Sequence, residues 1–242
     1  MAKQNAPKGA AETQSALSKQ EDFILKYKNF FIGAVVALIV IVVGLNYWNN
    51  HKASQLEEAQ TEMQTPELAM QLAMTQLSQS AEAFDGKLFE QALNGDSTGT
   101  GMGFLKIADE YSSTKAGNLA NLYAGLCYAH LNKWEEAVKY LEKYDDTDDI
   151  LISPAALGAL GNAYAHVNQA DKAVSTLTKA AEKADNIMLS PIYYIQAGEI
   201  LESQGKKADA LKLYQKVKAL KTTSQSSPYV DMIDEYIERV SE

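Results

Sequence analysis

The chain is poor in the residues that usually build compact chemical sites. Its 242 residues include one cysteine, Cys127, and three histidines, His51, His130 and His166. A single cysteine excludes an intramolecular disulfide framework, a cysteine zinc cluster and a CxxC redox pair, and so few histidines leave little for a metal site. We therefore expect no cofactor, no metal and no catalytic residue, and a protein that is not an enzyme.

Arginine is almost absent as well. Of the 22 basic residues, 21 are lysine and one is Arg239, against 31 acidic residues, and the formal net charge is −9. Arginine supplies the bidentate fork that recognises phosphate and carboxylate, and nucleic-acid binding needs a basic surface. The composition therefore argues against nucleic acid as a partner.

Two local patterns suggest chemistry but lack the required context. Residues 95–103 hold four glycines, but no predicted strand precedes them and no Gly-Lys-Ser/Thr ends them, as a phosphate-binding loop would require. Residues 145–149 hold four aspartates but lack the glycine and the glutamate of an EF-hand loop. We interpret both as connections between helices, and we expect Cys127 to be a buried thiol rather than a nucleophile.

Long apolar runs are missing too, with one exception. Residues 29–50 are 22 residues without a charge, and as a helix they would span about 33 Å against a hydrocarbon core of about 30 Å. Tyr47 and Trp48 lie at the end of the run, as in the aromatic belt of a membrane interface. The run predicts a transmembrane signal anchor; a cleaved signal peptide is the competing interpretation, but no small-x-small cleavage site follows.

The charges flanking this run predict its orientation. Residues 1–28 carry five lysines and three acidic residues, while the remaining chain carries 17 basic and 28 acidic residues, a net charge of −11. The positive-inside rule places residues 1–28, a predicted disordered tail, in the cytoplasm. Residues 51–242 are then the exported domain.

The exported part repeats with a period of 37 residues. Ser-Pro pairs recur at that spacing, which predicts three helix starts with serine as N-cap and proline at the first helical position. Small residues recur at equivalent places as well, where two antiparallel helices could approach closely while larger residues fill the gap on either side. The pairs are Ser153-Pro154, Ser190-Pro191 and Ser227-Pro228; the small residues are Gly125, Gly161 and Gly198 and Ala137, Ala173 and Ala210; the larger ones include Leu141, Leu177 and Tyr214.

This pattern resembles the tetratricopeptide repeat, whose signature is Leu-Gly, Tyr, Ala, an aromatic residue and Pro in about 34 residues. The resemblance implies repeats over about 117–153, 154–190 and 191–227. The signature tryptophan is missing, since Asn121, Leu157 and Tyr194 occupy its place.

Further helices are predicted on both sides of the repeats. Upstream they cover 66–84, beginning at Thr65-Pro66, about 87–93, and 104–111, which is predicted to be the second helix of a degenerate repeat. Downstream, 228–242 has the spacing of an amphipathic capping helix. No segment has a strand pattern. The predicted fold is all-α, an N-terminal transmembrane helix followed by a tetratricopeptide-repeat solenoid with a C-terminal capping helix.

In tetratricopeptide domains the first helix of each repeat lines a concave groove that holds peptides. The resemblance implies that the groove of this chain is lined by Leu122, Leu126, His130, Gly158, Asn162, His166, Ile195, Glu199 and Ser203. Of these only Asn162 suits a clamp for a terminal carboxylate. Two alternatives stay open: the groove recognises nonpolar segments, or it is filled by the chain's own helix 66–84. The two histidines are interpreted as polar groove residues rather than metal ligands.

A short cytoplasmic tail, one anchor and an exported repeat domain together resemble the bacterial ancillary Sec translocon subunit family, which shares its repeat module with a periplasmic cell-division coordinator. The resemblance implies a single-pass inner-membrane protein with a periplasmic C-terminal domain. Its implied partners are translocon subunits, periplasmic chaperones or nascent exported chains, and a homo-oligomer stays open. The alternative function is an envelope scaffold that organises a cell-wall, cell-division or secretion complex.

Overall fold

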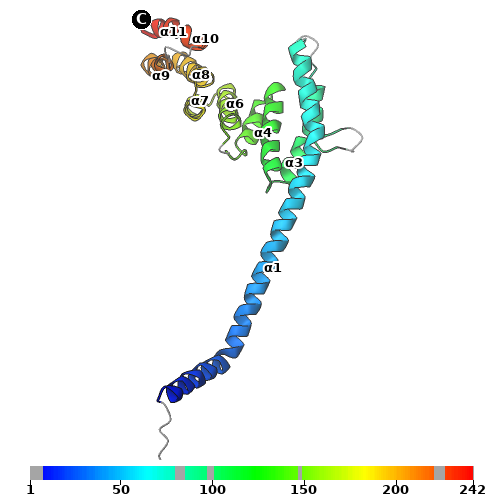
Figure 1. Cartoon of the computed structure of the whole chain (residues 1–242). Helices are drawn as coiled ribbons and strands as arrows, with labels where there is room; N and C mark the ends of the chain where they lie inside the picture. Colours follow the sequence, from blue (N-terminus) through cyan, green and yellow to red (C-terminus); the bar gives the residue numbers. More distant parts are fainter. Residues whose placement is uncertain (1–7, 80–84, 97–100, 147–148, 221–226, 242) are drawn as a thin grey trace, which may run out of the picture. The chain divides into compact units, whose positions relative to one another are not determined.

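The computed structural model of the chain forms two compact units, residues 1–54 and 55–242, and we describe each by itself. Helix labels follow Figure 1. The structure describes residues 8–79, 85–96, 101–146, 149–220 and 227–241, and describes no side chain of residues 8–36, 51 and 52.

The first unit is formed by helix α1 (Lys8–Gln79), whose residues 55–79 belong to the second unit. The helix includes residues 8–28, for which the sequence predicts a disordered tail; residues 1–7 of that tail lie outside the described residues. Among the described residues no helix is long and apolar enough to cross a membrane. Residues 29–36 of the predicted span lie outside those whose side chains are described.

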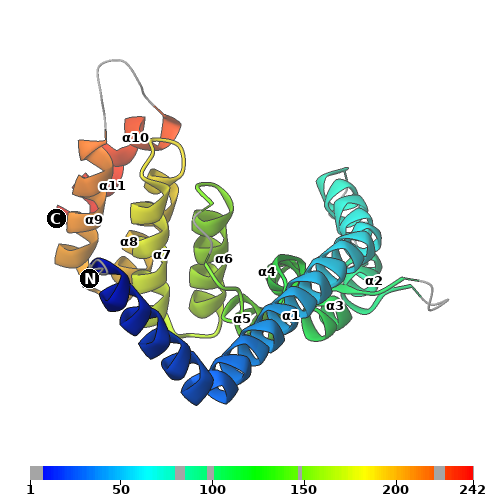
Figure 2. The same ribbon diagram turned by 60° about the horizontal axis from the view of Figure 1, so that its bottom comes forward.

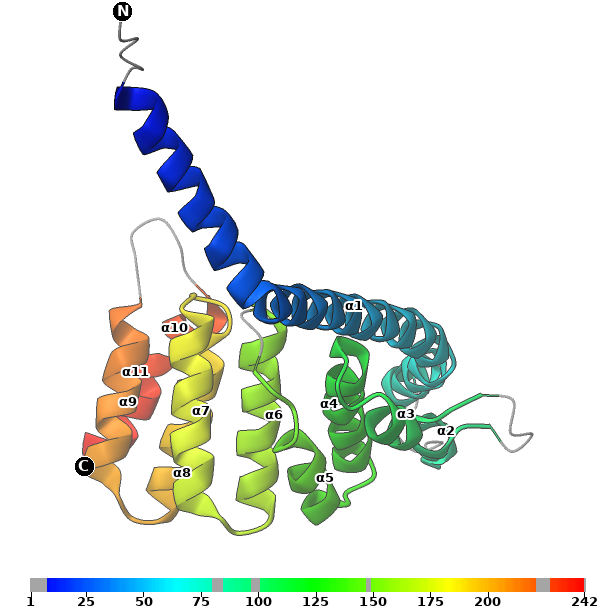
Figure 3. The ribbon, with the colours of Figure 1, turned by 90° about the horizontal axis from the view of Figure 1, so that it is seen from below.

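The second unit is a solenoid of antiparallel helix pairs, and in the described residues its backbone forms no strand, only an isolated bridge between Gly95 and Met102. Figures 2 and 3 show α6, α7, α8 and α9 side by side, each packed against the next. This confirms the all-helical repeat solenoid. Its helices after α1 are α2 (Lys87–Asn94), α3 (Phe104–Glu110), α4 (Lys115–His130), α5 (Trp134–Leu141), α6 (Ile152–His166), α7 (Ala170–Ala184), α8 (Ser190–Ser203), α9 (Lys207–Ala219), α10 (Pro228–Asp231) and α11 (Ile233–Ser241).

The close helix pairs of the repeats are built on the predicted glycines. A Cβ atom on Gly125 would lie 2.5 Å from Leu141, one on Gly161 2.6 Å from Leu177, and one on Gly198 2.3 Å from Tyr214. Contacts that short do not occur between real side chains, so each position accepts only glycine without a shift of its neighbour. The close approach predicted at the repeat glycines is confirmed in all three repeats, and the structure shows which large residue fills each gap.

The turns inside the repeats share one geometry that the sequence analysis did not identify. Asn132, Asn168 and Gly205 have positive φ angles of 55°, 60° and 72°. The residue after each donates its backbone N–H to a carbonyl five residues earlier, as in a Schellman motif. These bonds are Lys133 N to Tyr128 O at 2.9 Å, Gln169 N to Tyr164 O at 2.8 Å and Lys206 N to Leu201 O at 2.9 Å.

None of the serines of the three Ser-Pro pairs makes the predicted capping bond, although α10 begins at Pro228 with Ser227 as its N-cap residue. α6 begins at Ile152 and α8 at Ser190, and neither helix has a side-chain bond from its N-cap residue. The free backbone N–H groups are bound by Asp149, whose Oδ1 accepts from Leu151 and Ile152, and by Asn186, whose Oδ1 accepts from Met188 and Leu189. Ser190 instead donates to the carbonyl oxygen of Ala181 at 2.7 Å.

Pro66 does not begin a helix either. It lies inside α1, so the predicted start at Thr65-Pro66 is wrong, and residues 80–84 of that predicted helix lie outside the described residues. Proline in a helix removes one backbone hydrogen bond. Here Pro66 is fully buried, and it lies between Met63 and Ala69, which belong to the core formed with Phe104. Burial on this face offsets the lost bond.

The C-terminal cap consists of two helices, since α10 ends at Asp231 and α11 begins at Ile233, where the sequence predicts one helix. Arg239 of α11 forms two hydrogen bonds with Glu202 of α8, from Nε at 2.9 Å and from Nη2 at 2.8 Å. The hydroxyl of the buried Tyr214 donates to the same carboxylate. The only arginine of the chain therefore joins the cap to the last repeat.

Candidate functional site

A depression of about 620 Å³ lies between α6 and α8, beside the start of α5. The two helices contribute residues near their carboxyl-terminal ends, because α6 ends at His166 and α8 at Ser203. The lining residues are Trp134, Asn162, Ala165, His166, Gln196, Glu199, Ile200 and Ser203. Trp134, Ala165 and Ile200 make part of the surface apolar, and the others provide polar groups.

Four of the predicted groove residues meet in this depression. Asn162 and His166 lie four residues apart on α6, and Glu199 and Ser203 lie four residues apart on α8. Residues at that spacing share one face of a helix. The repeat register therefore brings the expected side chains of two neighbouring helices into one surface.

The other predicted residues do not reach the depression. Leu122 and Ile195 are buried in the hydrophobic core, and Leu126 is half-buried against the same core as Leu122. His130 stacks on Phe89 of α2, with ring centroids 4.7 Å apart. Burial lowers the pKa of His130, so its imidazole favours the neutral form.

The chain's own helix does not line the depression. Of α1, the residues Gln60, Met63 and Glu67 line a separate hollow of about 280 Å³ with Lys115, Ala116 and Leu119. No described residue of α1 belongs to the surface between α6 and α8. The described part of the predicted helix 66–84 therefore leaves this surface open.

Trp134 is the groove residue that the sequence analysis missed most clearly. It begins α5, the second helix of its repeat, and the predicted groove used first helices only. Its indole ring stacks on the imidazole of His166, with centroids 3.6 Å apart and planes 1° apart. The chain has only two tryptophans, and one of them directly follows a repeat turn. That rarity and position were the available signal that Trp134 lies at the groove.

The polar groups of the depression are one carboxylate and several groups that can both donate and accept hydrogen bonds. Glu199 is exposed and accepts a hydrogen bond from the hydroxyl of Tyr236 on α11. The Oε1 atom of Gln196 is buried and has no hydrogen-bond partner among the described residues. Ser203 donates its hydroxyl hydrogen to the carbonyl oxygen of Ile200 at 2.7 Å. Among the described residues, no lysine or arginine lines this surface.

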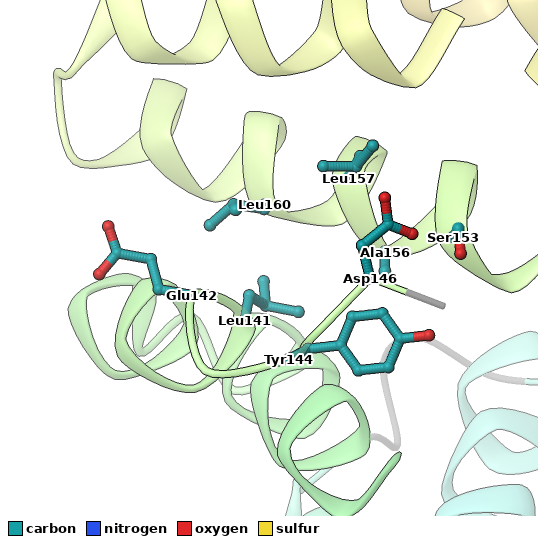
Figure 4. A pocket seen from close by; sticks show the side chains of 8 residues that line it. All are labelled: Leu141, Glu142, Tyr144, Asp146, Ser153, Ala156, Leu157 and Leu160. Carbon is teal, nitrogen blue, oxygen red and sulfur yellow. The ribbon is translucent and has the colours of Figure 1, made fainter. Parts of the chain in front are cut away.

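A smaller pocket of about 150 Å³ lies between the end of α5 and α6, where Figure 4 shows leucines on both walls and two carboxylates. Both carboxylates have partners. Glu142 accepts from Tyr164, whose pKa burial and this bond raise to about 12. Burial alone would raise the pKa of Asp146, but bonds from Lys183 and Ser153 hold it below its usual value. These partners make the acidic groups part of the packing between repeats.

Potential metal ligands and the single thiol were the remaining candidates for chemistry. In the part of the chain that the structure describes, no group of three His, Cys, Asp or Glu residues could hold a metal ion. Cys127 is fully buried, and burial raises the pKa of its thiol to about 12. The thiolate needed for nucleophilic chemistry is therefore strongly disfavoured.

Comparison with known proteins gives a family and a fold. A family model described as a tetratricopeptide repeat-like domain matches residues 21–235. Two crystal structures of a Podosopora anserina protein, described as a kinesin light chain with nearly identical TPR-like repeats, match as well, one of them of a variant with a single substitution. They are 16% and 15% identical to this chain, each with a TM-score of 0.51, and the alignments cover 73% of this chain and 83% and 82% of those chains.

The crystal structure of MamA protein also matches, with a TM-score of 0.43, 15% identity, and coverage of 73% of this chain and 86% of that one. No curated protein matches the chain. At these identities the likeness to solved structures extends to the fold alone.

Proposed function

Because the chain belongs to the tetratricopeptide repeat-like domain family, we propose that it binds a segment of another protein in the depression between α6 and α8. The depression carries the proposal, since it combines the apolar surface of Trp134 and Ile200 with several polar groups at one place. Protein-binding sites typically combine an aromatic anchor with a few placed hydrogen-bonding groups. The fold itself is that of a protein-interaction module.

We also propose that the apolar run of α1 anchors this module in a membrane. Its described large side chains, from Leu38 to Leu45, are more than half exposed on every face of the helix. A soluble partner would cover one face of such a helix, whereas lipid covers all of them. Tyr47 and Trp48, exposed at the end of the run, suit the interface.

The finer proposal is an ancillary subunit of the bacterial Sec translocon that connects emerging chains with periplasmic folding factors. The order of basic tail, apolar run and acidic repeat unit supports it. Anchoring raises the local concentration of the groove near membrane partners without any new contact. The alternative, an envelope scaffold of a cell-wall, cell-division or secretion complex, uses the same anchor and groove with other partners.

Site-specific photo-crosslinking in cells distinguishes these roles. A photoreactive residue replaces Ser203 in the depression, and in a control chain it replaces Lys179, which is exposed on α7. We expect adducts with translocon subunits, exported chains or periplasmic chaperones from position 203 and not from position 179. Adducts with cell-wall or division proteins would favour the scaffold, and equal adducts from both positions would refute binding in the depression.

The anchor has its own test. Protease added to spheroplasts should digest the repeat unit, and alkaline extraction should leave the undigested chain in the membrane fraction. Protection of the repeat unit in intact spheroplasts would contradict the proposed orientation.

A further inference from the structure

We infer that the depression between α6 and α8 selects a protein segment that carries a lysine or arginine side chain beside an apolar one. The inference rests on the proposed protein-binding role and names the chemistry of the partner. Three independent features of the surface carry it: its carboxylate, the ends of two helices, and its tryptophan.

The carboxylate of Glu199 is the first feature. It is the only carboxylate among the described lining residues, and Tyr236 is one hydrogen-bond donor to it. Its side chain is exposed. A bound ammonium or guanidinium group can therefore pair with this carboxylate by a charge-assisted hydrogen bond.

The carboxyl-terminal ends of α6 and α8 add to the negative electrostatic potential of the depression. Their last residues, His166 of α6 and Ser203 of α8, line the same depression. Each helix carries the equivalent of about half a negative charge at its carboxyl-terminal end, where cations are stabilised. An anionic segment would meet two helix ends and a carboxylate of its own sign.

Trp134 supplies both an apolar surface and an attraction for cations. Indole is the aromatic ring that binds ammonium and guanidinium groups best, over its face and within about 6 Å. The stem of a lysine or arginine can lie along Trp134 and Ile200 while its charged end reaches Glu199.

Two cations near the end of α8 are paired elsewhere. Lys206 contacts Asp171 at 3.2 Å, and Arg239 contacts Glu202 at 2.8 Å. The chain from residue 29 onward has a net charge of −11. The depression thus combines one carboxylate and two helix carboxyl ends within an acidic chain, and a cationic segment complements it.

The test uses the full-length chain in mild detergent with Trp48→Phe, so that Trp134 is the only tryptophan and its fluorescence reports on the depression. The probes are a short capped peptide that alternates lysine with leucine and alanine, and two versions with norleucine or glutamate at the lysine positions. We expect the lysine peptide to bind about tenfold tighter than the norleucine peptide, and the glutamate peptide to bind most weakly.

Two variants with the same change in net charge locate the effect. Glu199→Gln should lower the lysine preference about fivefold and leave the affinity for the norleucine peptide unchanged. Glu238→Gln, which removes an exposed carboxylate of α11 that does not line the depression, should keep the full preference. Circular dichroism checks that both variants are folded.

Equal affinities for the lysine and norleucine peptides would overturn the inference and leave the proposed protein-binding role standing. A preference that Glu238→Gln lowers as much as Glu199→Gln would also overturn it, because the cause would be the net charge of the domain. If no peptide binds, the inference fails, and the crosslinking from position 203 decides the proposed role separately.

Discussion

Replacing Gly198 by alanine tests the packing argument on which the repeat fold rests. An ideal Cβ at this position would lie 2.3 Å from Cε1 and 2.7 Å from Cζ of Tyr214. The ring of Tyr214 is completely buried, and its hydroxyl is held by Glu202. The ring therefore cannot shift to relieve the clash without disturbing its neighbours.

Two opposing effects set the magnitude. Alanine is favoured over glycine in a helix by about 1 kcal/mol, whereas overpacking of a core costs about 1–3 kcal/mol. The contact is far below 3 Å and involves a ring fixed at its far end, so the cost lies near the upper limit. We expect Gly198→Ala to lower the free energy of unfolding by about 1–2 kcal/mol, or the melting temperature by about 2–8 °C for a unit of this size.

Urea unfolding of the full-length chain in detergent, followed by circular dichroism, measures the change. A double-mutant cycle with Tyr214→Ala isolates its cause, because without the ring Gly198→Ala should stabilise the chain by up to about 1 kcal/mol. If Gly198→Ala stabilises the otherwise unchanged chain, the close approach of α8 and α9 at this point is refuted.

Three further predictions concern the cap and the core. Arg239→Lys should cost about 1 kcal/mol, since lysine cannot form the bidentate bond to Glu202, and amide exchange in α11 should quicken; unchanged exchange would contradict this. The bonds from Arg239 lower the pKa of Glu202 from 4.5, so the stability that this group contributes is present above about pH 4.5 and is lost as pH falls through its lower folded value. Glu202→Gln should remove that part of the acid dependence, and a pH profile identical to that of the unchanged chain would refute it. Cys127, buried with a pKa of about 12, should react with iodoacetamide at pH 8 only after unfolding, and rapid labelling of the folded chain would show that it is accessible.

The repeat packing was predictable because its cause is local in the sequence. A glycine and a large residue recur at fixed places in each repeat, as in Gly161 and Leu177, and only one arrangement of two antiparallel helices lets the second fill the space over the first. At Gly198 the residue that fills this space is the aromatic Tyr214.

The helix starts at the Ser-Pro pairs were predicted to within two residues, but the capping role of the serines was wrong because a local rule was overridden by a tertiary contact. Ser190 is a good N-cap by type, but it lies buried against α7 and donates to Ala181. The capping is done four residues earlier by Asn186, and at the equivalent place by Asp149. Asp and Asn are both strong N-cap residues, and Asp149 and Asn186 lie 37 residues apart, one repeat period. This spacing could have identified them as the capping residues.

The groove itself shows why helix-face reasoning finds half of a binding surface. The predicted positions form three rows across the repeats, and their exposure rises toward the carboxyl end of each first helix. The first row is closed because neighbouring helices fill it, as Tyr193 does at Gly158, where a Cβ would lie 2.3 Å from the ring. The later rows stay open on α6 and α8, whereas Leu126 and His130 on α4 are half-buried. A second helix brings Trp134 against His166. Which row of positions is exposed depends on the side-chain volumes in the next repeat. A spacing rule therefore places the groove on the right helices, but the packing of neighbouring repeats decides which end of the groove is open.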